Sequence, residues 1–503
     1  MQQRGEWELN LVINESQPLW EYLRCAEKPV VLYGMGDGAL KILAVCRQYG
    51  IPIAGIFASD EFVRGHSFEG YPVESLAQIE ERLGDFIVLL CFGVDYDSML
   101  DRIAELSRRH ETYAPDIPVF GSDLFTPEYF REHQAEFDGI YDKLVHLRDI
   151  MGKKLGYEGY TTLGYYRMGR NCYTKADVEK FRAAVVKYIV PLADSIYREQ
   201  AKRLGKQYPM NAADNALMFR SGNPRPAGDA DAILKQGKKF YEELSPETGV
   251  FFNKMLDDQL MDVLSTPGKA GGGYCTGLGD YEMPFIFANF NGTQHDVEVV
   301  THEAGHAFAA YMNRDRIPYS YVWPSMEACE VHSMSMEFFA WPWAEGFFGA
   351  DARKFRYSHL AGALTFIPYG TMVDHFQHIV YEHPELTPAQ RHEEWKKLAA
   401  IYQPWMRLDG EIPFYGAGEY WQRQMHIYQS PFYYIDYCLA QTVSLQFWAM
   451  LQKDRADAGS HYMAYTKQGG SRTFTELKNA GLTTPFEESC LRGVSEAAKA
   501  WLD

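Results

Sequence analysis

The spacing of apolar residues changes near residue 137, and this change constrains the fold more than any other feature of the sequence. Before that point, short apolar runs alternate with a glycine turn and with helix-like stretches; the runs lie at 28–33, 51–60, 85–93 and 115–121. Such alternation favours a parallel sheet covered by helices. After that point, apolar residues recur at the spacing of amphipathic helices. The pattern predicts an α/β domain at 1–137 and a mainly α-helical domain at 138–503.

One stretch of the helical part has a different pattern. The run EMPFIFANF at 282–290 is rich in β-prone residues and follows the glycine loop GKAGGG. We expect it to belong to a small β-sheet. Our preferred interpretation is an edge strand along which a peptide can lie, and the alternative is a strand inside a small buried sheet.

Length and charge exclude several classes of protein. The chain has 503 residues, which exceeds what one hydrophobic core usually covers. Its formal net charge of −18 argues against nucleic-acid binding, since that affinity comes from Lys and Arg neutralising phosphates. The first residues contain no apolar signal core, and no run approaches the roughly 18 apolar residues of a membrane helix. We therefore expect a cytoplasmic protein without membrane or nucleic-acid partners.

The strongest chemical signal is the segment VVTHEAGHAFAAYM, which contains His302, Glu303 and His306. Histidines four residues apart lie on one face of a helix and can share a zinc ion, and the adjacent carboxylate can act as general base on a water molecule. The alternative is a helix whose two histidines are simply hydrogen-bonded. A second histidine pair, His375 and His378, lacks a glutamate placed as base, so we expect it to serve packing.

A zinc site needs a third protein ligand, and the segment WPSMEACEVHSMSMEFFAW offers several candidates. Pro324 and Ser325 mark a plausible helix start. In such a helix Glu327, Glu330 and Glu337 share one face, whereas His332 points away from it. Helix periodicity therefore predicts a face bearing carboxylates and does not select one ligand.

Several blocks of sequence in a fixed order narrow the choice of the third zinc ligand. They are YDKLVHLRDIMGKKLGYEGYTTLGYYRMGR, GKAGGGYCTGLGDYEMPFIFANFNGTQHDVEVVTHEAGHAF, SMEACEVHSMSMEFF and MHIYQSPFYYIDYCLAQ. With these blocks the chain, from about residue 140 onward, resembles the thimet oligopeptidase and oligoendopeptidase F family of zinc metallopeptidases. The resemblance implies a mostly helical body that cuts short unfolded peptides. It also implies that Glu330 is the third zinc ligand, which makes Glu337 a candidate for holding a ligand histidine in place.

The last of these blocks contains His426, Tyr433, Tyr434 and Tyr437. Peptide hydrolysis creates an oxyanion, and neutral donors aimed at it lower the barrier. Tyr433 and Tyr437 are four residues apart and can present both hydroxyls on one face. The resemblance implies this role for His426 and Tyr437, and less directly for Tyr433, while aromatic packing is the alternative for each tyrosine.

The glycine turn GMGDGA at 34–39 follows the first apolar run, and Asp60 ends the second. This part resembles the short Rossmann-like domains of sugar-modifying enzymes, which implies an unidentified small ligand at the turn; a purely structural module is the alternative. The main functional hypothesis is a zinc oligopeptidase. Its rivals are a zinc carboxypeptidase and a nucleotide- or sugar-binding protein with a non-catalytic peptidase scaffold.

Overall fold

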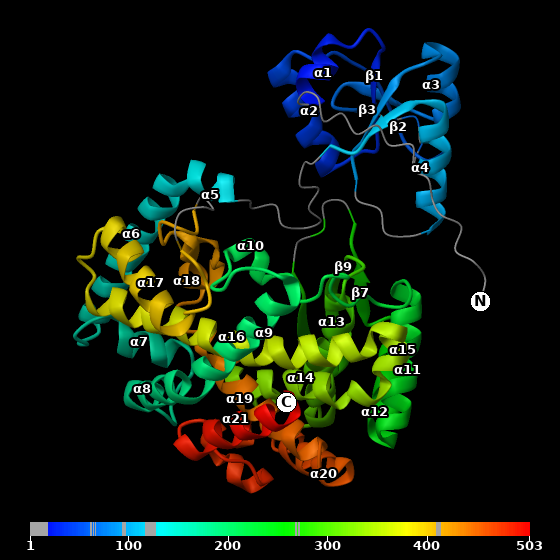
Figure 1. Ribbon diagram of the computed structural model, residues 1–503. Coiled ribbons are helices and arrows are strands. Elements are labelled where there is room, and N and C mark those ends of the chain that lie inside the picture. The colour runs from blue at the N-terminus through cyan, green and yellow to red at the C-terminus, as the bar shows by residue number, and fades with distance from the viewer. Residues whose placement is uncertain are drawn as a thin grey trace. The chain divides into compact units, whose positions relative to one another are not determined.

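The protein is described here by a computed structural model (Figure 1). It describes residues 19–502 apart from short gaps at 61–62, 64, 66, 93–96, 116–126, 267–268, 270–271 and 409–413. The chain divides into two compact units, Met1–Leu124 and Phe125–Asp503. The boundary predicted near residue 137 lies instead inside helix α6 (Gln134–Lys154). The preceding residues belong to the helical unit because Phe130 is buried in its core and Phe137 packs against that core.

Unit 1 contains a six-stranded sheet in the order β3-β4-β2-β1-β5-β6, parallel except for the β3–β4 pair. Its strands are β1 (Val30–Tyr33), β2 (Ile53–Phe57), β3 (Ser67–Phe68), β4 (Tyr71–Glu74), β5 (Ile87–Leu90) and β6 (Glu111–Tyr113), and its helices are α1 (Leu19–Cys25), α2 (Asp37–Tyr49), α3 (Leu76–Leu83) and α4 (Asp97–Arg109). Both faces of the central strands are covered: Val30 and Leu32 join one hydrophobic cluster and Val31 joins another. Burial on both faces explains why the sequences of these strands are continuously apolar. The strand expected at 115–121 lies, apart from Pro115, outside the described residues.

Unit 2 is mainly helical, as the sequence predicts. Its helices are α5 (Pro127–Glu132), α6, α7 (Tyr160–Arg167), α8 (Lys175–Ala184), α9 (Val190–Leu204), α10 (Ala212–Asn215), α11 (Ala230–Leu244), α12 (Pro246–Asp257), α13 (Gln294–Asn313), α14 (Met326–Phe339), α15 (Ala344–Phe348), α16 (Ala352–Glu382), α17 (Pro388–Tyr402), α18 (Met425–Gln429), α19 (Tyr434–Leu451), α20 (Arg455–Thr466) and α21 (Glu488–Leu502). A π-helical turn at Val185–Ile189 joins α8 to α9. Among the described residues, no helix combines the length and apolar character that crossing a membrane requires.

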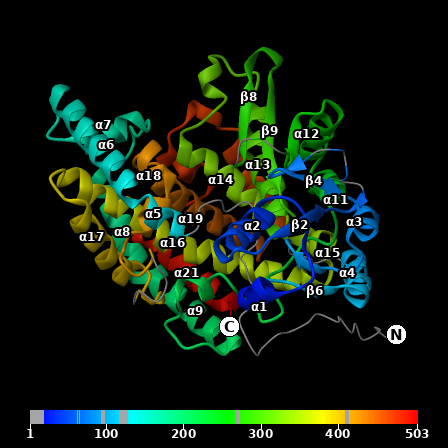
Figure 2. The same cartoon turned by 90° about the horizontal axis from the view of Figure 1, so that it is seen from above.

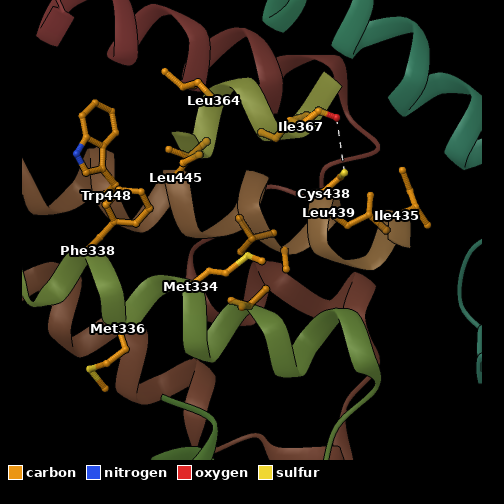
Figure 3. Packing of buried hydrophobic residues seen from close by; sticks show 14 of the residues in the cluster. Met334, Met336, Phe338, Leu364, Ile367, Ile435, Cys438, Leu439, Leu445 and Trp448 are labelled. Atoms are coloured by element: carbon orange, nitrogen blue, oxygen red, sulfur yellow. Dashed lines mark hydrogen bonds between the residues drawn. The ribbon is translucent and has the colours of Figure 1, made fainter. Parts of the chain in front are cut away.

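Helix α14 lies at the centre of unit 2 and packs against α13 and α19. All its side chains from Glu327 to Met336 are buried. Met334 and Phe338 of α14 face α19, whose other side is covered by Leu364 and Ile367 of α16 (Figure 3). Burying such side chains contributes about 1.5–3 kcal/mol each. The carboxylates of Glu327 and Glu330 are therefore held among buried side chains.

A three-stranded sheet in the order β7-β9-β8 lies beside α13 (Figure 2). Its strands are β7 (Met261–Leu264), β8 (Tyr274–Leu278) and β9 (Met283–Phe290). The expectation that the run at 282–290 forms an edge strand is wrong, because β9 is hydrogen-bonded to β7 on one side and to β8 on the other. Its apolar character reflects this central place, and β8 is the edge strand on the other side.

Candidate metal centre

Helices α13 and α14 cross at close range, and this crossing assembles the site. A Cβ atom added to Gly305 of α13 would lie 2.6 Å from the Cα atom of Ser333 and 2.8 Å from the carbonyl oxygen of His332 on α14. Only glycine fits there, so Gly305 allows the two backbones to touch. The contact brings Glu330 of α14 up to the histidines of α13.

The structure brings His302 and His306 of α13 together with Glu330 of α14. One ligand atom from each residue lies within 4.8 Å of the others, a grouping found only here among the described residues. Glu330 Oε2 is 3.4 Å from His302 Nε2 and 3.5 Å from His306 Nε2. Zinc bonds of about 2.0–2.1 Å at tetrahedral angles separate ligand atoms by about 3.3 Å. The separations of Glu330 from the two histidines match this spacing, and two imidazoles with one carboxylate are a ligand set that zinc accepts.

A chain of hydrogen bonds fixes the orientation of His302. Its Nδ1 atom lies 2.6 Å from Glu337 Oε1, and Glu337 Oε2 lies 2.6 Å from His359 Nε2. Trp341 Nε1 donates to His359 Nδ1 at 2.9 Å. Because an indole N–H only donates, the proton of neutral His359 is on Nε2 and points at Glu337. Glu337 thus accepts two hydrogen bonds and leaves Nε2 of His302 free to face a metal.

The two carboxylates of the site remain ionised despite their burial. Burial by itself would raise the pKa of Glu337, but hydrogen bonds from His302 and His359 lower it to about 2. Burial likewise opposes ionisation of Glu330, yet His306 and His302 hold its pKa well below the usual range. Against the effect of burial, the same two carboxylates raise the pKa of His302, so zinc binding to this imidazole competes with its protonation.

Glu327 and His332 lie apart from the three ligand atoms. Glu327 is 1% exposed, and neither of its carboxylate oxygens has a hydrogen-bond partner in the described part of the chain. Burial raises the pKa of this carboxyl. His332 packs against the Tyr465 ring, with the ring centroids 4.8 Å apart. Helix periodicity leaves several glutamates open as the third ligand, and the geometry favours Glu330 over Glu327.

Glu303 lies between the two histidines on α13 and is 7% exposed. A Cβ atom added to Gly273, the residue before β8, would be 3.7 Å from Glu303 Oε1. The carboxylate therefore lies between the proposed ligands and the start of the edge strand. A general base for a reaction at the metal needs such a location.

His426, Tyr433 and Tyr437 form one aromatic group beside Glu330. The His426 ring centroid is 5.9 Å from each tyrosine ring, and the two tyrosine rings are 4.8 Å apart. Tyr433 donates its hydroxyl hydrogen to Glu330 Oε1 at 2.9 Å. Burial raises the pKa of both tyrosines, so both hydroxyls remain neutral donors.

The imidazole of His426 is oriented by Gln424. Tyr369 donates to Gln424 Oε1 at 2.9 Å, which fixes the amide and turns its nitrogen toward His426 Nδ1 at 2.6 Å. Since Nδ1 accepts that bond, the proton of the neutral ring is on Nε2. Burial lowers the pKa of His426 and favours this neutral form.

The second histidine pair and the glycine turn, which the sequence also offers as candidates, do not belong to the group of metal-ligand atoms. His378 is hydrogen-bonded to the Tyr165 hydroxyl at 3.0 Å, and His375 to the Tyr402 hydroxyl at 3.1 Å, so each has a packing partner. In unit 1, Gly34 has φ +112° and comes directly after β1, where an added Cβ would lie 2.6 Å from the Phe92 ring. Asp60 is exposed after β2.

Three residues that orient this site, His359, Trp341 and Gln424, are not predicted from the sequence. His359 lies on α16, another helix than Glu337 and His302, so no local spacing links it to them. Only the position of Gln424, two residues before His426 and next to the block MHIYQSPFYYIDYCLAQ, gives a sequence signal.

Comparisons with known proteins identify the family of the chain. Residues 238–496, just over half of the chain, match Peptidase family M3. Oligopeptidase PepF of Bacillus subtilis (strain 168) is 26% identical over 262 residues, which cover 49% of this chain and 38% of that relative. The match thus spans less than two fifths of the relative's length.

Two solved structures are more similar. PZ peptidase A with inhibitor 2 has 43% sequence identity and a TM-score of 0.72, covering 88% of this chain and 73% of that one. A protein provisionally assigned as oligoendopeptidase F has 46% identity and a TM-score of 0.72, covering 81% and 69% respectively. The family match and these two likenesses show that the chain belongs to peptidase family M3.

Proposed function

We propose that this chain is a zinc-dependent endopeptidase that hydrolyses short, unstructured peptides. The observation that carries the proposal is the cluster of His302, His306 and Glu330 with the carboxylate of Glu303 on the same helix. Three protein ligands leave a position open, as catalytic zinc sites require. The oligopeptidase assignments of the relatives support peptides as the substrate class.

The chemistry follows from the residues around this cluster. Zinc bound by the three ligands would supply a Lewis acid that polarises the peptide carbonyl and lowers the pKa of water. Glu303 takes a proton from the attacking water and later delivers it to the leaving amine. His426 and Tyr437 donate hydrogen bonds to the oxyanion as it forms. Tyr433 joins them only when its one hydroxyl hydrogen leaves Glu330 Oε1.

The edge strand β8 is suited to hold the substrate backbone. It pairs only with β9 among the described strands, and its residues Tyr274 and Leu278 are exposed. An extended peptide can add to such an edge through main-chain hydrogen bonds, which bind many sequences alike. Because Glu303 lies next to Gly273 at the start of β8, a peptide on this edge passes the general base.

A peptide blocked at both ends tests the proposal. Zinc-loaded protein should cut an acetylated and amidated peptide of about ten residues at an internal bond, as mass spectrometry of the products reveals. Removal of single residues from a free C-terminus, with the blocked peptide left intact, would support a carboxypeptidase instead. Absence of any cleavage by zinc-loaded protein would favour a non-catalytic scaffold.

We also propose that unit 1 is a Rossmann-like module. The strand order β4-β2-β1-β5-β6, with parallel neighbours, supports this, because doubly wound sheets reverse their order between two central strands and bind ligands there. Gly34 and Gly36 follow β1 at that point. Thermal denaturation with nucleoside diphosphates and nucleotide sugars tests for a small ligand, and an unchanged melting temperature with all of them would favour a structural module.

A further inference from the structure

The residue before Tyr433 has an unusual backbone conformation. Phe432 has φ +67°, in the left-handed region that bulky residues rarely adopt. It is completely buried. Such a conformation is unfavourable and persists only where the surroundings enforce it, which occurs preferentially next to functional sites.

Two buried side chains from distant parts of the sequence hold this conformation. The Phe432 N–H donates to Gln377 Oε1 of α16 at 2.9 Å. The Phe432 carbonyl accepts a hydrogen bond from the Nη2 atom of Arg170, which also lies 2.5 Å from Asp436 Oδ1 on α19. Both polar groups of the Phe432 backbone are thereby fixed, the N–H by Gln377 and the carbonyl by Arg170.

The neighbouring chain is fixed in the same way. Arg148 of α6 donates to the carbonyl of Tyr428 in α18. The Phe432 ring fills the space that Gly164 of α7 leaves open, where an added Cβ would lie 2.6 Å from the ring. The turn between α18 and α19 is therefore set by α6, α7 and α16 together with the segment that carries Arg170.

This turn determines where Tyr433 points. Tyr433 directly precedes α19, and its carbonyl accepts from the N–H of Asp436 in the first helical turn. Its direction then depends on the dihedral angles of Phe432. In the observed conformation its hydroxyl reaches Glu330 Oε1 at 2.9 Å.

We propose that Arg170 and Gln377 are positioning residues: they enforce the left-handed turn at Phe432 and thereby aim Tyr433 at the metal ligand Glu330. The inference rests on the proposed function in that it takes Glu330 to be a zinc ligand. Residues that orient a metal ligand through a hydrogen bond typically contribute about 10- to 100-fold to metal affinity.

Zinc affinity, measured by competition with a chelator on the full-length protein, tests the inference. Gln377→Met keeps the size of the side chain and removes the acceptor, so zinc binding should weaken about tenfold, and Tyr433→Phe should weaken it about as much. Because Gln377 acts through Tyr433, the double variant should be no weaker than either single one. Multiplied losses in the double variant, or unchanged affinity in folded Gln377→Met, would overturn the inference.

The conservative variant Gln377→Glu is the matched control. Gln377 is fully buried, so a glutamate there should stay protonated, and its carbonyl oxygen can still accept from Phe432. Affinity should then recover to within about twofold of the wild type, and a loss equal to that of the methionine variant would count against the proposed hydrogen bond. Near-ultraviolet circular dichroism checks folding, and Gln377→Asn, whose amide is one methylene shorter, replaces the methionine variant if that variant does not fold.

Peptide cleavage provides an independent reading. In zinc-saturated Gln377→Met, kcat should fall while KM stays close to the wild-type value, because Tyr433 acts through the zinc ligand Glu330 and does not hold the bound peptide. If the wild type cleaves no peptide, the proposed function fails, and the affinities still decide whether Gln377 positions Tyr433.

Discussion

Replacing Glu337 by glutamine should weaken zinc binding almost as much as replacing it by alanine, although glutamine has nearly the same shape. His302 Nδ1 and His359 Nε2 both present N–H groups to Glu337 at 2.6 Å, since Trp341 holds the His359 proton on Nε2. A carboxylate accepts from both histidines. An amide offers one oxygen and turns its NH₂ group toward the other N–H, so one histidine loses its partner.

The expected loss of zinc affinity follows from the burial of the hydrogen bond between Glu337 and His302. Losing a partner that orients a metal-binding histidine costs about 10- to 100-fold in affinity, or about 1.4–2.7 kcal/mol. The Glu337 side chain is only 14% exposed, so water is poorly placed to replace the lost acceptor, and we expect the upper half of that range. Competition with a chromophoric chelator near neutral pH measures it, with the exposed Glu345→Gln as control. Wild-type affinity in folded Glu337→Gln would refute the inferred protonation of His359.

Three further predictions concern single side chains. Glu330→Ala should lose zinc, whereas Glu327→Ala should keep it, as metal analysis of the purified variants can show; the reverse result would overturn the ligand assignment. Tyr437→Phe should lower kcat with zinc content and KM nearly unchanged, and an unaltered kcat would reduce this tyrosine to packing. Burial lowers the pKa of His375 from 6.5 to about 4. As the pH falls through this window the unfolded chain takes up the proton first, so stability from this group is present above about pH 6.5 and is lost toward pH 4. His375→Gln should therefore flatten the fall of the urea-unfolding free energy in that window, by less than ~1.4 kcal/mol per pH unit because His375 is partly exposed, and an unchanged slope would contradict this.

The spacing of residues along a single helix predicts the two histidines of the site well. Histidines four residues apart have to share a face of any helix, so His302 and His306 converge whatever surrounds them. Pro324 and Ser325 mark the start of α14, whose first residue is Met326. The apolar runs at 28–33 and 85–93 contain β1 and β5 because strands buried on both faces leave no polar position.

Long-range packing decides what local spacing leaves open. Glu327 and Glu330 share a helical face, and only the crossing of α13 and α14 at Gly305 determines that Glu330 reaches the histidines. Likewise, the apolar run at 282–290 predicts a strand, yet its central place in the sheet follows from pairing with β7, which lies about twenty residues earlier in the chain. Phe130 lies on the α/β side of the boundary predicted near residue 137, and only its packing in the core of unit 2 assigns it to the helical unit.

The central claim is that Glu303 acts as general base at a zinc ion held by His302, His306 and Glu330. Measuring zinc content and turnover of Glu303→Gln side by side tests it most directly, with an internally quenched short peptide as substrate. The glutamine keeps the size of the side chain and removes the basic oxygen, so the variant should hold one zinc per chain while kcat falls by about 10²- to 10⁴-fold. A folded, zinc-loaded variant that cleaves the peptide at the wild-type rate would contradict the account.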